Sequence, residues 1–293
     1  MSLLDVAPII EQMLLVSENV SDINFSCGQK PQVEINGVLY PTSPIGLGKL
    51  SAYQTEMIAM SIIRDNPDAA DHLFKYRTAD LSYALPGKCR FRVNIFQQRN
   101  SYSIVMRVIP HEIPSFDALR LPPQLAEIAD IRNGVVLLTG PTGSGKSSTL
   151  AAIIDRINET KAYHIVTIED PIEFLHNHKK STINQREVGA DTKDFASALR
   201  AALRQAPKVI LVGEMRDLET AEIALEAAET GHLVLSTLHT IDASKTIDRI
   251  IGLYPKNEER IIRTRLAQTF RYIVSQRLIP TADGKGRIAA VEI

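Results

Sequence analysis

The loop from Gly140 to Ser147, with the sequence GPTGSGKS, constrains the fold of this chain more than any other stretch. It matches the pattern G-x-x-x-x-G-K-[ST]. The apolar run 135–138 precedes it, and apolar residues at the spacing of one helix face follow it, namely Leu150, Ile153, Ile154 and Ile157. A strand, a loop and a helix N-terminus in this order form the setting in which such a loop binds phosphate. A glycine-rich turn beside a surface lysine is the alternative, but it explains neither the strand nor the helix.

The residue types in the loop suit a nucleotide. Gly143 and Gly145 let the backbone turn its N–H groups toward a phosphate, and the helix N-terminus adds positive potential. Lys146 is expected to reach the β- and γ-phosphates, and the Ser147 hydroxyl to hold Mg²⁺. The predicted cofactors are therefore ATP and Mg²⁺. The predicted nucleotide-binding residues are Thr142, Gly143, Ser144, Gly145, Lys146, Ser147 and Ser148.

Composition narrows the class of protein. The 293 residues are 44% hydrophobic and 23% charged, which is typical of a soluble globular chain of one or two domains. A net charge of −1 argues against a protein built mainly to bind a nucleic-acid backbone. Cys27 and Cys89 support neither a zinc site nor a disulfide framework, and they suit a reducing cytoplasm. The longest apolar runs fall well short of the ~18 residues that span a bilayer, so membrane association is expected through a partner.

Residues 1–112 are predicted to form a small α+β domain. Helices are expected at 3–18 and 50–65, a hairpin with Asn36-Gly37 at its turn, and strands at 81–85, 89–98 and 101–109. In the second of these strands the period of two places Phe91, Val93 and Ile95 on one face and Arg90, Arg92 and Asn94 on the other. The sheet is thus expected to bury one face and to present a basic face, which a purely solvated surface would also explain.

A proline-rich stretch separates this domain from the next. Residues 113–118 are predicted to be an extended linker, and residues 119–293 an ATPase domain. Aliphatic strands at 135–139, 164–168, 209–212 and 233–237 alternate with helices at 146–158, 194–205 and 218–230. This alternation predicts an α/β fold with a parallel sheet, whose ligand groups gather at the carboxyl ends of the strands.

Three of these strand ends carry candidate chemistry besides the loop. Glu169 is interpreted as the base that positions or deprotonates water, Glu214 as the acid beside Mg²⁺, and His239 as a residue that senses the γ-phosphate. Helix capping is the alternative for Glu169, and an ion pair with Arg216 for Glu214. His232 begins the strand that His239 follows, roughly 23 Å away, so a structural role remains open for it.

Four ordered motifs resemble the secretion ATPase superfamily, most closely its pilus retraction members. They are GPTGSGKS, TIEDPIEF, VILVGEMRDLETAEIALEAAETGHLVLSTLHT and DASKTIDRIIGLYP. The resemblance implies a RecA-like P-loop ATPase domain preceded by a smaller α+β PAS-like domain. It implies a homo-hexamer in which Arg92, Arg99 and Arg107 reach the nucleotide of a neighbouring subunit, and His232 and His239 as a paired histidine motif. It also implies a cytoplasmic location, peripheral at the inner membrane through a pilus platform protein, without direct membrane insertion or nucleic acid.

The residues that follow the segment SQRLIP indicate the subtype of secretion ATPase. Pilus extension and type II secretion members usually carry a four-cysteine motif after this segment, whereas TADGKGRIAAVEI has none, which favours retraction. Two departures from the family are the segment 204–208, RQAPK, which lacks the usual acids, and the end at Ile293, where C-terminal helices are expected to be missing. The alternatives are a motor for pilus assembly or type II secretion and, from the basic helix with Arg260, Arg263, Arg265 and Arg271, a DNA-translocating RecA-like motor. A nucleotide-gated assembly switch with little turnover is a further alternative.

Overall fold

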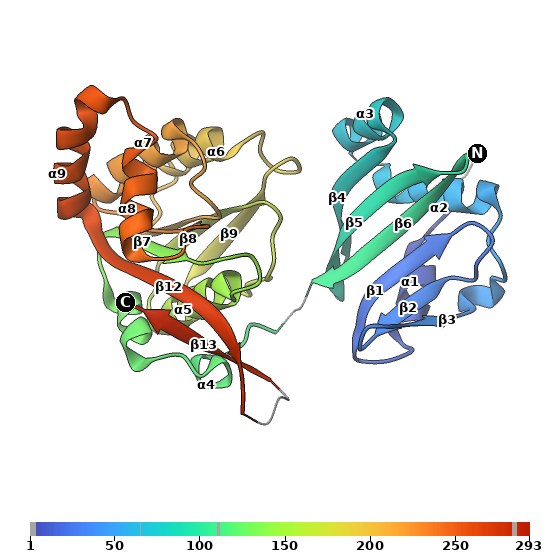
Figure 1. The fold of residues 1–293 in the computed structure, drawn as a ribbon. Coiled ribbons are helices and arrows are strands. Elements are labelled where there is room, and N and C mark those ends of the chain that lie inside the picture. Colours follow the sequence, from blue (N-terminus) through green and yellow to red (C-terminus); the bar gives the residue numbers. More distant parts are fainter. Residues whose placement is uncertain (1–3, 65, 110–111, 283–285) are drawn as a thin grey trace. The chain divides into compact units, whose positions relative to one another are not determined.

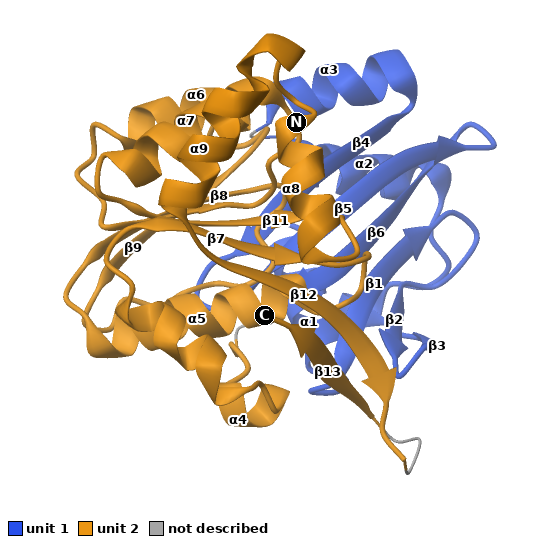
Figure 2. Cartoon of the chain, turned by 60° about the vertical axis from the view of Figure 1, so that its left-hand side comes forward, with its two compact units in different colours: residues 1–110 blue, residues 111–293 orange. Residues whose placement is uncertain are grey.

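The computed structural model describes the chain except for residues 1–3, 65, 110–111 and 283–285. The chain divides into two compact units, Met1–Pro110 and His111–Ile293 (Figure 2). Each unit has its own hydrophobic core and its own sheet. The predicted class, an α/β domain preceded by a smaller α+β domain, is confirmed.

The first unit is a six-stranded sheet in the order β3-β2-β1-β6-β5-β4. Neighbouring strands run antiparallel. The strands are β1 (Val20–Ser26), β2 (Gln32–Ile35), β3 (Val38–Pro41), β4 (Thr78–Leu85), β5 (Cys89–Gln98) and β6 (Ser101–Ile109). Phe91, Val93 and Ile95 are fully buried, as predicted, and share a core with residues of α1 (Ala7–Leu14) and α2 (Ala52–Ile63). The helices thus cover one face of the sheet and leave the face with Arg92 exposed.

The sequence prediction missed one helix of this unit. Helix α3 (Pro67–Tyr76) begins where the dipeptide Asn66-Pro67 was interpreted only as a helix end. The Asn66 side chain accepts a hydrogen bond from the Ala69 N–H at 2.9 Å, and Pro67 occupies the first helical position. An N-cap residue followed by proline also starts a helix, which explains the error.

The second unit has a seven-stranded sheet in the order β13-β12-β7-β11-β10-β8-β9 (Figure 1). Its strands are β7 (Gly134–Thr139), β8 (His164–Glu169), β9 (Thr182–Glu187), β10 (Val209–Val212), β11 (Leu233–Leu238), β12 (Phe270–Pro280) and β13 (Arg287–Glu292). All pairs are parallel except β12 with β13. The four predicted strands form the parallel centre of this sheet.

Helices cover both faces of the second sheet. One core contains residues of α6 (Phe195–Ala202), α7 (Leu218–Glu229), α8 (Ala243–Ile251) and α9 (Glu259–Thr269). The other contains residues of α5 (Lys146–Thr160) and the 3₁₀ segment η2 (Pro123–Asp130). Burial on both faces explains why the strands are continuous aliphatic runs instead of alternating ones. No helix in the described part of the chain is long and apolar enough to cross a membrane.

The prediction of an extended linker through residue 118 was wrong at its end. Helix α4 (Phe116–Leu119) begins inside that stretch. The Ser115 hydroxyl accepts a hydrogen bond from the Ala118 N–H at 3.1 Å and so starts the helix. The SFDA sequence is a capping signal that the surrounding prolines concealed.

Candidate nucleotide-binding site

The loop Gly140–Ser147 joins β7 to α5, as the motif predicts. Gly140, Gly143 and Gly145 have φ values of 143°, 77° and 87°, which favour glycine. Gly145 is the N-cap residue of α5, so the N–H groups of the first turn are not used by helical hydrogen bonds. Thr142 and Gly143 are exposed, whereas Ser147 and Ser148 lie half-buried in that first turn. The loop therefore offers backbone donors at a helix N-terminus, an arrangement that suits phosphate.

Lys146 is buried within the loop, with only 7% of its surface exposed. Its Nζ donates to the carbonyl oxygens of Gly140 at 2.8 Å and Pro141 at 3.1 Å. Burial lowers the pKa of Lys146 from its ordinary value, and the negative charges of Glu214 and Glu173 oppose that shift. Lys146 and the Glu214 carboxylate are thus near enough for their charges to interact.

Strand β12 supplies a loop partner that the sequence prediction did not identify. The Gln276 side chain, 2% exposed as a residue, donates from Nε2 to the Ser144 carbonyl at 2.8 Å. Its Oε1 accepts a hydrogen bond from the Thr149 hydroxyl at 3.0 Å. One residue earlier, the Ser275 hydroxyl accepts from the Thr139 hydroxyl at 3.1 Å. The sequence signal was a pair of polar residues, Ser275 and Gln276, directly after the apolar residues Ile273 and Val274.

Glu169 is the last residue of β8, which extends one residue beyond its predicted end at Ile168. The Glu169 Oε1 accepts hydrogen bonds from the Thr167 hydroxyl at 2.6 Å and from the Gln185 Nε2 at 3.1 Å. Burial raises the pKa of Glu169, and these two hydrogen bonds partly oppose the rise. A carboxylate with a raised pKa and fixed orientation suits a general base. Gln185 in β9 was not foreseen, because that strand was not predicted.

Glu214 and His239 meet, although 25 positions separate them in the sequence numbering. The Glu214 Oε2 lies 3.3 Å from the His239 Nε2 and 2.8 Å from the Arg216 Nε. Glu214 follows β10 and His239 follows β11, which are adjacent parallel strands. The ion pair with Arg216, considered from the sequence as an alternative, is therefore present together with the histidine contact.

His232 lies at the opposite end of β11 from His239. Its Nδ1 is 2.9 Å from the Ala227 carbonyl oxygen and 3.3 Å from the Thr230 hydroxyl. Both partners belong to the end of α7. His232 therefore contacts the C-terminal end of α7, at the end of β11 that lies away from the loop. The two histidines do not form one cluster.

The three arginines of the first unit do not converge on one point. Arg92 in β5 lies directly opposite Arg107 in β6. Arg107 donates from Nε to the Oδ1 of buried Asp22 at 3.0 Å. Arg99, by contrast, is in the β5–β6 turn with a φ of 45°, seven residues or roughly 23 Å along the strand from Arg92. Of these three arginines, only Arg92 and Arg107 are neighbours in the sheet.

Two arginines of the basic helix α9 form ion pairs within their own unit. Arg265 forms ion pairs with Glu222 at 2.6 Å and Glu229 at 2.6 Å, and Arg263 pairs with Glu259 at 2.9 Å. Arg271, which the sequence prediction placed in this helix, lies in β12 instead and donates to the carbonyl oxygen of Gln268 at 2.8 Å. These contacts weaken the argument for a DNA-translocating motor.

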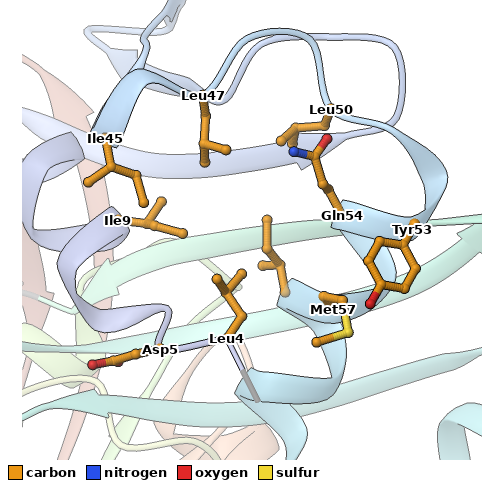
Figure 3. Close-up of a pocket in the computed structure, with 10 residues that line it drawn as sticks. Leu4, Asp5, Ile9, Ile45, Leu47, Leu50, Tyr53, Gln54 and Met57 are labelled. Carbon is orange, nitrogen blue, oxygen red and sulfur yellow. The ribbon is translucent and has the colours of Figure 1, made fainter. Parts of the chain in front are cut away.

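An apolar pocket lies between α1 and α2 of the first unit, with a volume of about 400 Å³ (Figure 3). Ile9, Leu50 and Ile58 are buried residues of its wall, Met57 is half-buried, and Tyr53 is exposed. It contains none of the predicted site residues, so it has no assigned part in phosphate chemistry.

The comparisons with known proteins agree with this geometry. The family model described as type II/IV secretion system protein matches residues 78–292. The type IV pilus retractation ATPase PilT of Pseudomonas aeruginosa is 45% identical over 276 residues, covering 94% of this chain and 78% of the relative. The twitching motility protein of Neisseria gonorrhoeae is 46% identical over 263 residues, covering 90% of this chain and 69% of the relative.

A solved structure extends the agreement to the fold. The crystal structure of the pilus retraction motor PilT with bound ADP matches with a TM-score of 0.88 and 47% identity. It covers 99% of this chain and 82% of that chain. The likeness thus includes both units as well as the loop.

Proposed function

Because the chain belongs to the type II/IV secretion system protein family, we propose that it is an ATP-hydrolysing motor that drives type IV pilus retraction. The observation that carries the ATPase assignment is the placement of Lys146, Glu169 and Glu214 at one edge of a parallel sheet. The assignment of retraction is supported by the similarity to PilT and to the twitching motility protein.

The loop residues fit ATP. A Cβ at Gly143 would meet no atom within 4 Å, so the loop is open on that side, while Lys146 supplies a positive charge. Ser147 and Glu214 fit Mg²⁺, because hydroxyl and carboxylate oxygens are the ligands that this ion prefers. When bound, Mg²⁺ would neutralise charge on the phosphate oxygens. Lys146 would stabilise the negative charge of the γ-phosphate as it is transferred.

Glu169 is proposed to accept the proton of the attacking water. Its Oε1 is held by Thr167 and Gln185, which fixes the direction in which the other carboxylate oxygen points. Glu214 would hold Mg²⁺ together with Ser147. His239, in contact with Glu214, is proposed to respond to the presence of that phosphate.

Catalysis is proposed to need a neighbouring subunit. The Arg92 side chain is exposed and has no hydrogen bond or ion pair with the other described residues, so it is available to a phosphate of another subunit. An arginine supplied in trans contributes roughly 10³–10⁵ to the rate of phosphoryl transfer. We therefore propose a homo-hexameric ring, located in the cytoplasm and bound to the inner membrane through a platform protein of the pilus.

Two measurements test this function. Purified protein should release phosphate from ATP with Mg²⁺, and an unchanged rate with and without DNA would exclude a DNA motor. Deletion of the gene in its own organism should leave surface pili that accumulate and do not retract. Absence of pili would instead assign the protein to assembly, and absence of ATP turnover would assign it to a nucleotide-gated switch.

A further inference from the structure

We infer that Gln276 is a positioning residue that holds the phosphate-binding loop in the shape needed to bind the phosphates of ATP. This inference rests on the proposed ATPase function, and it concerns a residue of β12 that lies outside the loop and outside the sequence motifs assigned above. It predicts that the loop is active only when this strand is docked beside it.

The first step is that both ends of the Gln276 amide are engaged. Nε2 donates to the Ser144 carbonyl at 2.8 Å, and Oε1 accepts from the Thr149 hydroxyl at 3.0 Å. Because the donor faces an acceptor and the acceptor faces a donor, rotating the amide by half a turn would break both bonds. The side chain is buried, so water cannot replace either partner. Gln276 therefore connects the loop to the first turn of α5 in one fixed orientation.

The second step concerns the direction of a backbone donor. In a planar trans peptide the C=O and the following N–H point in opposite directions. Since Gln276 holds the Ser144 carbonyl toward β12, the Gly145 N–H points away from β12, on the side of the loop that is free to receive a phosphate. Gln276 thus orients a donor that it does not itself touch.

The third step concerns two glycines of the loop, at which any side chain would collide with β12. A Cβ at Gly140 would lie 2.2 Å from the Gln276 carbonyl oxygen, and one at Gly145 would lie 2.8 Å from the Gln276 Nε2. Gly143, at which a Cβ would meet nothing, has no such neighbour. The motif glycines at 140 and 145 therefore permit the close approach of Gln276, in addition to any role toward phosphate.

The experiment replaces Gln276 by leucine, which is similar in size and makes no hydrogen bonds. The readouts are the affinity of the purified protein for fluorescently labelled ADP with Mg²⁺, the KM and kcat for ATP, and the midpoint of thermal unfolding. Gln276→Leu is expected to weaken ADP binding and raise KM about 10-fold or more, because the Ser144–Gly145 peptide is no longer held. Thr149→Val keeps the bond to Ser144, so its effect should be clearly smaller.

Val274→Ala is the matched control. Val274 is a fully buried residue of the same strand, lies two positions from Gln276, and packs in a core with residues of α5. Its truncation should lower the thermal midpoint while ADP affinity stays as in the wild type. A purely structural Gln276 would behave in the same way, with a lower midpoint and unchanged affinity, and that result would overturn the inference.

The outcomes separate this inference from the proposed function. If the wild type fails to bind ADP, or if the Lys146→Ala variant binds ADP as well as the wild type does, the ATPase assignment fails. The inference about Gln276 then fails with it. If the wild type binds and Lys146→Ala does not, but Gln276→Leu binds like the wild type, only the role of Gln276 is refuted. If Gln276→Leu does not fold, Gln276→Met takes its place, because methionine is unbranched like glutamine and has no amide to hold the Ser144 carbonyl. An affinity for ADP in Gln276→Met like that of the wild type would then contradict the inference.

Discussion

Arg92 lies directly opposite Arg107 across strands β5 and β6, so two like charges are neighbours on the exposed face of the first sheet. Such a pair is unfavourable unless other charges compensate it. Asp22, on the strand beyond Arg107, compensates one member through the 3.0 Å contact with the Arg107 Nε. This leaves the two arginines with different expected roles: Arg107 stabilises the fold, and Arg92 is available for catalysis.

Substituting the two arginines should therefore separate activity from stability. Arg107→Ala leaves buried Asp22 without its partner and should lower the free energy of unfolding by about 1–3 kcal/mol. Arg92→Ala should leave that free energy nearly unchanged and lower phosphate release by about 10³-fold or more. Chemical denaturation and a steady-state ATPase assay measure the two effects. Loss of activity only in Arg107→Ala would reverse the assignment.

Mixing two inactive variants tests whether Arg92 acts in trans. In rings that contain both Lys146→Ala and Arg92→Ala subunits, an intact loop can lie beside an intact Arg92. Partial recovery of phosphate release is expected, because each active site then takes its lysine and its arginine from different subunits. No recovery in rings shown to be mixed would place the catalytic arginine in the same subunit as the loop.

Lys146→Ala should remove hydrolysis while the fold persists. The lysine charge is proposed to stabilise the γ-phosphoryl group, and loss of one such donor costs about 10²–10³ in rate. Its bonds to Gly140 and Pro141 join residues of a single loop, so the unfolding midpoint should change little. A turnover number close to that of the wild type would contradict the assignment of the loop.

The raised pKa of Glu169 predicts that the rate of ATP hydrolysis falls at low pH, which gives the plot of rate against pH an acidic limb. A base must be ionised to accept a proton, so the rate should fall as the pH drops through the pKa of Glu169 in the folded protein. Because burial raises that pKa above 4.5, the acidic limb should lie at a higher pH than for an exposed glutamate. Glu169→Gln should lower hydrolysis by ~10² or more while ATP still binds.

Thr167→Val provides the matched control for this limb. The Thr167 hydroxyl bonds to Glu169 and lowers its pKa, so its removal should move the acidic limb further toward neutral pH. Circular dichroism at each pH excludes acid unfolding as the cause. A limb that stays in place in Thr167→Val would show that another group is titrating.

Glu214→Gln should weaken the response of ATP hydrolysis to Mg²⁺. The amide keeps an oxygen near Arg216 and His239 but removes the charge that attracts the ion. A titration with MgCl₂ at fixed ATP should show half-saturation at a concentration about 10-fold higher or more. If Glu169→Gln changed this titration and Glu214→Gln did not, the roles of the two carboxylates would be exchanged.

The sequence predicted the part of the fold that depends on local pattern. The bounds of β5, β6 and β10 were predicted residue by residue, since alternation or a short apolar run determines them. The contact between the phosphate-binding loop and Gln276 was not predictable in this way. Gln276 reaches Ser144 only because β12 adds beside β7 in parallel, and no local signal in FRYIVSQRLIP specifies which strand it joins. Arg99 was expected in the turn between β5 and β6, where the structure has it, but the family resemblance grouped it with Arg92 although the length of β5 separates the two residues.

The pairing of β12 with β7 also has a consequence for translation. Ser144 leaves the ribosome well before its partner Gln276, which follows 132 residues later. At an elongation rate of ~5–20 residues per second, that interval lasts on the order of 10 s. During it the emerging loop has neither the Ser275–Gln276 pair nor the strand that closes this side of the sheet. If Gln276 positions the loop as proposed, the nascent chain acquires its nucleotide-binding geometry only after β12 has been synthesised.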